Sequence, residues 1–496
     1  MKKLHLTGLA LITAALFVVL FYQKIIGINL LLFEAIMIPI MLYINRPIKL
    51  NLLTGSILFA TSLTAVFTVI VSTSWGIVIN FALLFCLGYV LAFQKGKSFP
   101  HVAYGTFLHC FLAQISLFLS YFEDNSNSSF MKKSYKFFFV VFIPVAILLI
   151  FTLLYSFSSS IFSQKVTDIL SNTLFLFFIL GLIVANPLLM RTKTLSIYED
   201  DISSSDDLKR IRKKYSFSFS TTVLRTQNTA GIVLLFLLNA LILCFNYIDI
   251  SNIWIGFKWD GNSLKEFVHE GTWVLLFSVL ISAAIALYFF HNNLNFFSEN
   301  KLLKRLTVIW MAQNLIMTVS VAIRNLYYIN YFGLAYKRIA VLFFLVLVAI
   351  GLITIIIKIL KIKSSYFLWR TNGFSLLAVL TVSALFNWDV VITKYNFAHY
   401  DRSFIEYRFI YELSNATLPY AVKSIEELTE IQDVQEKIMP PDIIFQNCLW
   451  NYQTYSFWID YKKNIFLKTY KSRNILEWNI PDYLAYKKLV SAEKQP

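Results

Sequence analysis

The chain contains few charged residues. Only 15% of its 496 residues are Asp, Glu, Lys or Arg, and 57% are hydrophobic, whereas soluble globular proteins average about 25% charged residues. The mean hydropathy is +0.63. This scarcity of charge excludes an ordinary soluble enzyme and a disordered chain. It favours a membrane protein built from helices.

The sequence also lacks the common cysteine and glycine motifs. The four cysteines, Cys86, Cys110, Cys244 and Cys448, include no CxxC pair, so the sequence predicts neither a disulfide framework nor a zinc-finger site. No two glycines have GxxxG spacing, which removes the commonest motif for tight helix dimerisation in membranes. The segments expected to span the membrane have few Gly or Pro breaks at their centres, which argues against a transporter with broken helices.

The usual enzyme motifs are absent. Gly96-Lys97-Ser98 resembles the end of a phosphate-binding loop, but the required first glycine is replaced by Leu91. His269-Glu270 is not a zinc-protease motif, because Trp273 stands where the second histidine is needed. GxGxxG and GxSxG do not occur. We therefore expect no cofactor, no bound metal and no nucleic-acid partner.

Long hydrophobic runs are what the chain has in abundance. A helix that crosses the hydrocarbon core needs about 20 mostly apolar residues, and such runs recur along the sequence. They lie near 5–22, 25–44, 51–72, 74–93, 137–158, 169–190, 229–248, 268–290, 304–324, 337–358 and 369–386. A twelfth segment, 101–120, is short and contains His101, His109 and Gln114. It is predicted to lie in or re-enter the inner interface.

Charge placement predicts the orientation, because cytoplasmic loops are enriched in Lys and Arg. With the N-terminus inside and 101–120 not crossing, more than half of the 44 basic residues fall on the cytoplasmic side. Few fall in the outer loops: Lys24, Lys165, Lys258, Lys265, Arg324, Lys337 and Arg338. The sequence thus predicts eleven spans, or twelve if 101–120 crosses, with a cytoplasmic N-terminus and an extracytoplasmic C-terminus.

The predicted fold is an all-α, polytopic transmembrane bundle with a small C-terminal domain. The expected parts are an N-terminal membrane half (1–190), a charged cytoplasmic loop (191–228), a C-terminal membrane half (229–386) and an aromatic-rich extracytoplasmic domain (387–496). The last part is too rich in Tyr, Trp and Phe to be disordered. Helices are expected at 403–413, 423–438 and 481–490, separated by Pro419 and Pro440-Pro441.

The 191–228 loop is charge-segregated, with acidic residues before basic ones. The acidic group is Glu199, Asp200, Asp201, Asp206 and Asp207, and the basic group is Lys209, Arg210, Arg212, Lys213 and Lys214. The simplest interpretation is a solvated loop whose basic end meets anionic lipid headgroups. Membrane lipids are thus expected partners, and the loop and the C-terminal domain are the two segments that protein partners would reach.

Polar residues recur at the predicted outer ends of four spans. These residues are His269, Glu270, Arg324, Asn325, Tyr336, Lys337, Arg338, Asn387 and Asp389, here called the outer-face polar cluster. Charges near hydrocarbon are costly unless they are paired or face water, so they are candidate functional residues. The competing interpretation is a structural network, or side chains that extend to the headgroups. We expect Glu270 to pair with Arg324, and Asp389 to pair with Lys337 or Arg338.

Four other polar residues lie deeper in the predicted spans. Glu34, Asn239, Gln313 and Asn314 each interrupt an apolar run. Hydrogen bonding between neighbouring helices is the expected role of such side chains.

Several motifs resemble one bacterial family. They are Phe267–Thr272, Tyr288–Phe290 with Asn293–Phe296, Ala322–Asn325 with Tyr327-Tyr328, Phe332–Ile339, and Asn387–Ile392 with Tyr395-Asn396. Together they resemble polytopic membrane proteins catalogued only as a domain of unknown function. The likeness is specific over 225–400 and continues weakly at Trp478-Asn479 and Tyr483–Tyr486. It implies a protein of the bacterial cytoplasmic (inner) membrane, and it implies no activity, substrate or cofactor.

Three functional hypotheses follow. The first is a multi-pass accessory, sensory or envelope-assembly component that acts through its outer domain and cytoplasmic loop. The second is a transporter whose pathway opens at the outer-face polar cluster. The third is a membrane enzyme acting on a lipid-linked or envelope substrate, with His269 or Glu270 as general base and Arg324, Lys337 and Arg338 binding an anionic headgroup. The first is favoured, because repeats, broken spans and diagnostic catalytic spacings are absent.

Overall fold

Each of the eleven apolar runs contains a helix in the computed structural model. The structure describes residues 3–48, 50–94, 96–121, 143–159, 161–162, 164–166, 172–191, 201, 203–210, 221–255, 263–290, 293–439 and 450–493. Throughout these residues the regular secondary structure is helical, apart from one isolated antiparallel bridge between Asp207 and Lys363. The all-α prediction is therefore confirmed.

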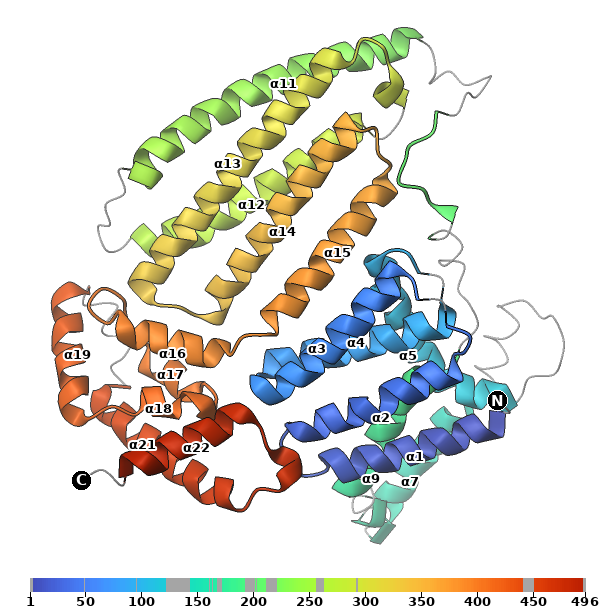
Figure 1. Cartoon of the computed structure of the whole chain (residues 1–496), viewed down its shortest axis with the longest axis vertical. Coiled ribbons are helices and arrows are strands. Elements are labelled where there is room, and N and C mark those ends of the chain that lie inside the picture. The colour runs from blue at the N-terminus through green and yellow to red at the C-terminus, as the bar shows by residue number, and fades with distance from the viewer. Residues whose placement is uncertain are drawn as a thin grey trace. The chain divides into compact units, whose positions relative to one another are not determined.

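The chain divides into two units, and the boundary lies inside the predicted loop. Unit 1 contains Met1–Ile202 together with Asn474–Asn479, and unit 2 contains Ser203–Arg473 and Ile480–Pro496. The helices of unit 1 are α1 (Lys3–Phe21), α2 (Ile28–Ile44), α3 (Leu52–Ile70), α4 (Ser74–Phe93), α5 (Phe99–Tyr121), α7 (Ile143–Ser158), α9 (Thr173–Leu189) and the short η6 (Ile475–Glu477) (Figure 1).

Unit 1 is held together by close helix packing. A Cβ atom on Gly181 of α9 would lie 2.9 Å from the backbone of Ala14 in α1, so only glycine allows this approach. Helices α3 and α4 form an antiparallel pair, and their N-termini are capped by the side chains of Asn51 and Thr73. The backbone N–H of Ile28 donates to the carbonyl of Trp478 at 3.0 Å. The C-terminal segment 474–479 is therefore attached to the turn between α1 and α2.

Unit 2 begins with a layer of long helices. They are α11 (Thr221–Asp249), which continues into the π-helical η3 (Ile250–Ile255), α12 (Ser263–Phe289), the turn η4 (Asn293–Phe296), α13 (Lys301–Phe332), α14 (Tyr336–Leu360) and α15 (Ser365–Ser383). Helix α13 packs against α11, α12 and α14, and α14 packs against α15 (Figure 1). Helix α11 starts eight residues before the predicted span at 229, because its first two turns extend beyond the apolar stretch.

Deep polar side chains in unit 2 form the interhelical hydrogen bonds that the sequence predicts. Asn239 of α11 donates to the carbonyl of Leu306 at 3.1 Å and accepts from Gln313 at 2.9 Å. Asn246 donates to the carbonyl of Gln313 at 3.1 Å. These contacts join α11 to α13. Asn314 instead donates to the carbonyl of Trp310 within its own helix.

The residues after α15 form a compact helical region around one core. Its helices are α16 (Trp388–Ala398), α17 (Tyr407–Glu412), η5 (Asn415–Thr417), α18 (Leu418–Ala421), α19 (Ile425–Ile438), α21 (Tyr452–Lys471) and α22 (Ile480–Glu493). The three helices predicted from sequence correspond to α17, α19 and α22, whereas α21 was not predicted. The shared core contains Ile392, Ile410, Leu428, Tyr455 and Leu489, and it includes Ile339 from α14.

Several helices have the length and composition of membrane spans. Among the residues that the structure describes, five helices are long and apolar enough to cross: Leu52–Ile70, Ser74–Phe93, Thr222–Ile255, Lys301–Phe332 and Tyr336–Leu360. A sixth is formed if Ser365–Ser383 and Trp388–Ala398, which meet at a 66° bend, make one span. Large apolar side chains such as Phe157 and Leu241 are 89% and 67% exposed on helix surfaces, as expected where lipid replaces water. The chain is thus a membrane protein.

The remaining predicted spans correspond to shorter apolar helices: Leu6–Phe21, Ile28–Ile44, Ala146–Ser158, Thr173–Leu189 and Val274–Phe289. The predicted interfacial segment 101–120 is α5, one continuous helix that packs against α4 and α9. His109 is buried there, with its Nε2 atom 3.0 Å from the carbonyl oxygen of Pro187. The count of eleven spans and the interfacial position of α5 remain predictions.

Three of the five acidic residues in the 191–228 loop are bonded to the protein, and the other two, Glu199 and Asp200, lie outside the described residues. In unit 2, Asp207 pairs with Lys363 at 2.5 Å in the turn between α14 and α15, and Asp206 pairs with Arg370 in the second turn of α15. In unit 1, Asp201 accepts from the backbone N–H of Lys97 at 2.6 Å. The solvated loop that was expected is therefore fixed at both of these points. Residues 211–220, which hold most of the basic group, lie outside the described residues.

Candidate functional site

The turn between α13 and α14 is held by side chains from two directions. Gly333 has φ = 77°, a left-handed conformation that favours glycine. The amide of Asn396 in α16 accepts from the N–H of Leu334 at 2.6 Å and donates to the carbonyl of Leu334 at 3.1 Å. A Cβ atom on Gly333 would lie 2.7 Å from the Asn396 Oδ1 atom. Glycine is required at this position by both conformation and space.

Arg338 closes the same turn from the first helical turn of α14. Its Nη1 atom donates to the carbonyls of Phe332, at 2.7 Å, and Gly333. Its guanidinium lies 4.5 Å from the centre of the Tyr328 ring, a cation–π contact. The backbone carbonyl of Arg338 accepts from the side chain of Asn325 at 3.0 Å. The motifs around Arg324 and around Tyr336 therefore meet at one end of the helix pair.

Asp389 connects this end of the bundle to the C-terminal helices. It lies in the first turn of α16, where the positive end of the helix dipole favours a carboxylate, and the Asn387 side chain caps that helix. The Oδ1 atom of Asp389 accepts from the hydroxyl of Tyr336, and Oδ2 accepts from the backbone N–H of Ser414 at 3.0 Å. We call Asp389, Tyr336 and Ser414 the Asp389 joint, because they link α14, α16 and the segment after α17.

Lys462 of α21 adds a positive charge near the joint. Its ammonium group donates to the carbonyls of Tyr411, at 2.6 Å, and Leu413. Burial lowers the pKa of Lys462 to about 8, and the nearby carboxylate of Asp389 opposes that decrease. Because the ammonium is engaged by two carbonyls, Lys462 serves to hold the segment that supplies Ser414.

A buried ion pair lies between α11 and α13. Asp249 and Arg324 form a salt bridge in which both side chains are almost fully buried. The other carboxylate oxygen of Asp249 accepts from Ser320, whose hydroxyl accepts from the indole N–H of Trp254 at 3.2 Å. Each carboxylate oxygen thus has a donor, which is the condition under which a buried charge is tolerated.

The structure joins members of the outer-face polar cluster in two separate sets. Asn325 bonds to the backbone carbonyl of Arg338, and Tyr336 bonds to Asp389, whose helix is capped by Asn387.

The side-chain pairs in the structure differ from the predicted ones. The prediction that Asp389 pairs with Lys337 or Arg338 is wrong: its described bonds are those of the Asp389 joint. Lys337 is exposed, because it is on the opposite side of the α14 turn from the buried Ile339. The side chains of His269 and Glu270 lie outside the described residues, so the Glu270–Arg324 pair stays a prediction beside the observed Asp249–Arg324 pair.

Three participating residues were not predicted. Asp249 stands immediately after an apolar run, and a carboxylate at that position was the available signal. Ser414 contributes only its backbone N–H, which leaves no trace in the side-chain pattern. Lys462 lies in α21, a helix whose mixed polar and aromatic sequence hides its periodicity.

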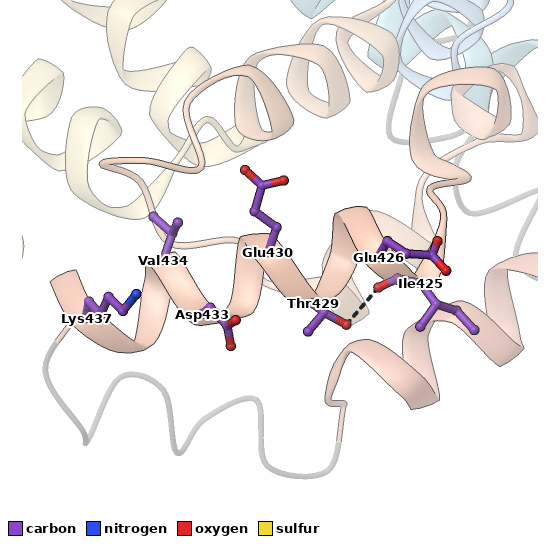
Figure 2. A pocket seen from close by; sticks show the side chains of 7 residues that line it. All are labelled: Ile425, Glu426, Thr429, Glu430, Asp433, Val434 and Lys437. Carbon is purple, nitrogen blue, oxygen red and sulfur yellow. Dashed lines mark hydrogen bonds between the residues drawn. The ribbon is translucent and has the colours of Figure 1, made fainter.

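An open hollow lies on the surface of α19. Its volume is about 550 Å³, and all seven lining residues belong to that helix: Ile425, Glu426, Thr429, Glu430, Asp433, Val434 and Lys437 (Figure 2). Thr429 donates to the backbone carbonyl of Ile425 at 2.8 Å. The hollow therefore lies on the exposed side of one acidic helix, and no catalytic groups converge in it.

No group of three or more His, Cys, Asp or Glu side chains among the described residues could hold a metal ion. No curated protein and no solved structure matches the chain. A family model, described as "Domain of unknown function (DUF4153)", matches residues 57–424, which include α14, α16 and the Asp389 joint. Since this match covers most of the sequence, the chain belongs to the DUF4153 family of domains of unknown function.

Proposed function

We propose that this protein is a multi-pass component of the bacterial inner membrane that works by presenting its C-terminal helical domain outside the cytoplasm. In this proposal the chain crosses the membrane eleven times, with its N-terminus in the cytoplasm. Its role is accessory, sensory or concerned with envelope assembly, and it is not catalytic.

The proposal rests on the hydrogen bonds that Asp389 makes within the protein. A general acid or base must have an atom free to meet a substrate. Both oxygens of Asp389 instead accept hydrogen bonds within the protein, and Arg338 is engaged by two backbone carbonyls and a tyrosine ring. These groups hold the C-terminal helices to the α13–α14 turn. Such a rigid attachment suits a domain whose position relative to the membrane matters.

The arrangement of helix ends supports the orientation. The starts of α14 and α16 meet at the Asp389 joint, and the last part of α13 bonds to the first turn of α14. Asp207 pairs with Lys363 in the α14–α15 turn and Asp206 pairs with Arg370 in α15, beyond the other end of α14. The predicted outer and cytoplasmic segments thus lie at opposite ends of α14. This separation is what the positive-inside rule requires of the eleven-span topology.

Cysteine accessibility in intact cells tests the topology. In variants whose only cysteine replaces an exposed serine, an impermeant thiol reagent should label Ser491→Cys in intact cells. It should label Ser203→Cys only after permeabilisation. Labelling of Ser491→Cys that also requires permeabilisation would contradict the proposal.

The anchoring role of Asp389 is tested by Asp389→Asn, with the exposed Asp433→Asn as matched control. The substitution weakens two hydrogen bonds to a charged acceptor, each worth about 1.5–3 kcal/mol. We expect lower thermal stability and faster proteolysis within 387–496, while Asp433→Asn behaves like the unchanged protein. A catalytic Asp389 would give the opposite result, with stability and proteolysis unchanged.

A further inference from the structure

Glu34 differs from the other deep polar residues because its carboxyl group has no hydrogen-bond donor. It lies in the middle of α2, 1% exposed. Among the described residues, Glu34 is the one carboxyl group with both oxygens fully enclosed and neither at hydrogen-bond distance from a partner. A carboxylate in this state would be strongly destabilising, and such groups are normally neutralised by a proton or an ion.

The neighbouring amide of Asn80 also contains an acceptor without a donor. Its Nδ2 atom donates to the carbonyl of Thr61 at 3.2 Å and to the hydroxyl of Thr64 at 3.1 Å, both on α3. The backbone carbonyl of Thr61 can only accept, so the NH₂ end of the amide must face α3. The Oδ1 atom of Asn80 is left buried without a donor. The Asn80 side chain interacts with the Glu34 carboxyl group, and neither carboxyl oxygen has a partner at hydrogen-bond distance.

The helices around Glu34 carry few titratable residues. Helix α2 packs against α1, α3, α4, α9 and the short η6. The titratable residue of η6 is Glu477, which has the same sign of charge as Glu34 and lies beside Gly27 at the start of α2. Helices α3 and α9 contain no titratable residue at all. On α4 the titratable residues are the buried Cys86 and Tyr89, whose ring centre lies 5.7 Å from that of His109 in α5. Lys3 and His5 stand at the beginning of α1, far along the sequence of that helix from its middle.

We propose that Glu34 and Asn80 form a proton-binding site inside unit 1, in which the protonated carboxyl group of Glu34 donates to Oδ1 of Asn80. One added proton supplies the missing donor and removes the charge in a single step. A metal ion fits less well, because hard cations take six or more oxygen ligands. Here Thr61 and Thr64 already accept from Asn80, and the described residues offer no further acidic ligand.

The position of the site gives it a consequence for the rest of unit 1. Glu34 is six residues from Ile28, whose N–H bonds to Trp478 in the C-terminal segment. Release of the proton would place a bare charge on α2, about 9 Å along the helix from this attachment at 1.5 Å per residue. The helix that binds the proton is therefore also the helix that holds segment 474–479. This inference is independent of the proposed role of the C-terminal domain.

The test uses a hydrophobic carbodiimide, which reacts with protonated carboxyl groups in apolar surroundings. The full-length protein in lipid nanodiscs is treated at neutral pH, and the modified residue is located by mass spectrometry. We expect an adduct on Glu34, none on Asp249, and complete loss of the α2 adduct in Glu34→Gln. Sodium chloride should not protect Glu34 when choline chloride at equal ionic strength is the reference. Protection by sodium, or an unmodified Glu34, would overturn the proposal.

Infrared spectroscopy provides a second readout that does not depend on reagent access. The C=O band of a protonated carboxylic acid should be present in the unchanged protein and absent in Glu34→Gln. In Asn80→Leu the same band should shift to higher frequency, because the acceptor is lost. Asn239→Leu is the matched control, since that asparagine is bonded to Gln313 in unit 2. A band that is unaffected by both Glu34→Gln and Asn80→Leu would refute the site.

Discussion

The two units treat a buried acid in opposite ways. In unit 2, Asp249 is 5% exposed and is bonded to both Arg324 and Ser320. In unit 1, Glu34 is 1% exposed and has no donor at hydrogen-bond distance. Burial is similar, so the difference lies in the neighbours. An acid with a matched cation contributes to structure, whereas an acid without one is neutralised or binds something.

The amides of the two units do not show this contrast. Asn239, Gln313 and Asn246 of unit 2 form a chain of interhelical bonds, but the Oε1 atom of Gln313 lacks a donor at hydrogen-bond distance, as does the Oδ1 atom of Asn80 in unit 1. The difference between the units therefore lies in their buried acids: Asp249 has a cation and a hydroxyl donor, and Glu34 has neither.

The largest expected effect comes from breaking the paired acid. Arg324→Met leaves Asp249 charged, buried and without its cation, and losing one partner of a buried pair costs about 3–5 kcal/mol. We expect a large fall in thermal stability and in membrane abundance.

The double variant Asp249→Leu with Arg324→Met sharpens this result. Removing both charges avoids the isolated ion, so most of the lost stability should return. Equal stabilities of the single and double variants would show that the pair does not carry the interaction.

An intermediate effect is expected from Lys462 and appears as a pH dependence. The pKa of Lys462 is lowered from 10.5 to about 8 in the folded protein. Between these values the unfolded chain binds a proton that the folded chain does not, so stability rises with pH. The free energy of unfolding of the unchanged protein, relative to Lys462→Met, should therefore increase from pH 8 to pH 10.5.

Denaturant titrations at several pH values measure this slope, and Lys468→Met is the control because Lys468 is exposed. Lys468→Met should run parallel to the unchanged protein across the range. A constant difference between the unchanged protein and Lys462→Met would rule out a buried, weakly basic lysine.

The smallest effect is expected at the unpaired acid. Glu34→Gln replaces a protonated carboxyl group with an amide that can donate to Asn80 in the same way, so stability should change by less than about 1 kcal/mol. Asp249→Asn is the matched substitution in unit 2 and leaves Arg324 unpaired, at a cost of about 3–5 kcal/mol. Thermal unfolding of the two variants under the same conditions measures the loss of stability in each. Similar losses of stability would contradict the distinction between the units.

Much of the helical structure could be predicted from the sequence, and the reasons are local. Apolar runs long enough to cross a bilayer must form helices, because backbone groups in hydrocarbon have to bond within their own segment. Helix α19 was also predictable: Ser424 and Glu427 form a capping box, a pattern of neighbouring residues. Helix α21 was missed because its apolar positions alternate with Lys and Asn, so that only contact with Tyr411 and the shared core identifies its buried face.

The candidate site was predictable only in part. Arg324, Tyr336, Arg338 and Asp389 each stand at the same predicted end of an apolar run. The structure forms two separate bonded sets there, Asn325 with Arg338 and Tyr336 with Asp389. Their partners were misjudged because charge matching considers side chains alone. The donors and acceptors that satisfy Arg338 and Asp389 include backbone groups of Phe332, Gly333 and Ser414.

The sequence by itself determined that this is a helical membrane protein of the DUF4153 family, because composition, apolar run length and motif order are properties of the chain. Only the tertiary structure decided which polar residues are satisfied. Glu34 and Asp249 look alike in sequence, each an acid in or beside an apolar run. The helices packed around them differ: α13 supplies Ser320 and Arg324 to one acid, and α4 supplies an already engaged asparagine to the other. Whether a buried polar group has a hydrogen-bond partner depends on atoms that are a few ångströms away in space and far away in the chain. A linear pattern could therefore not reveal it.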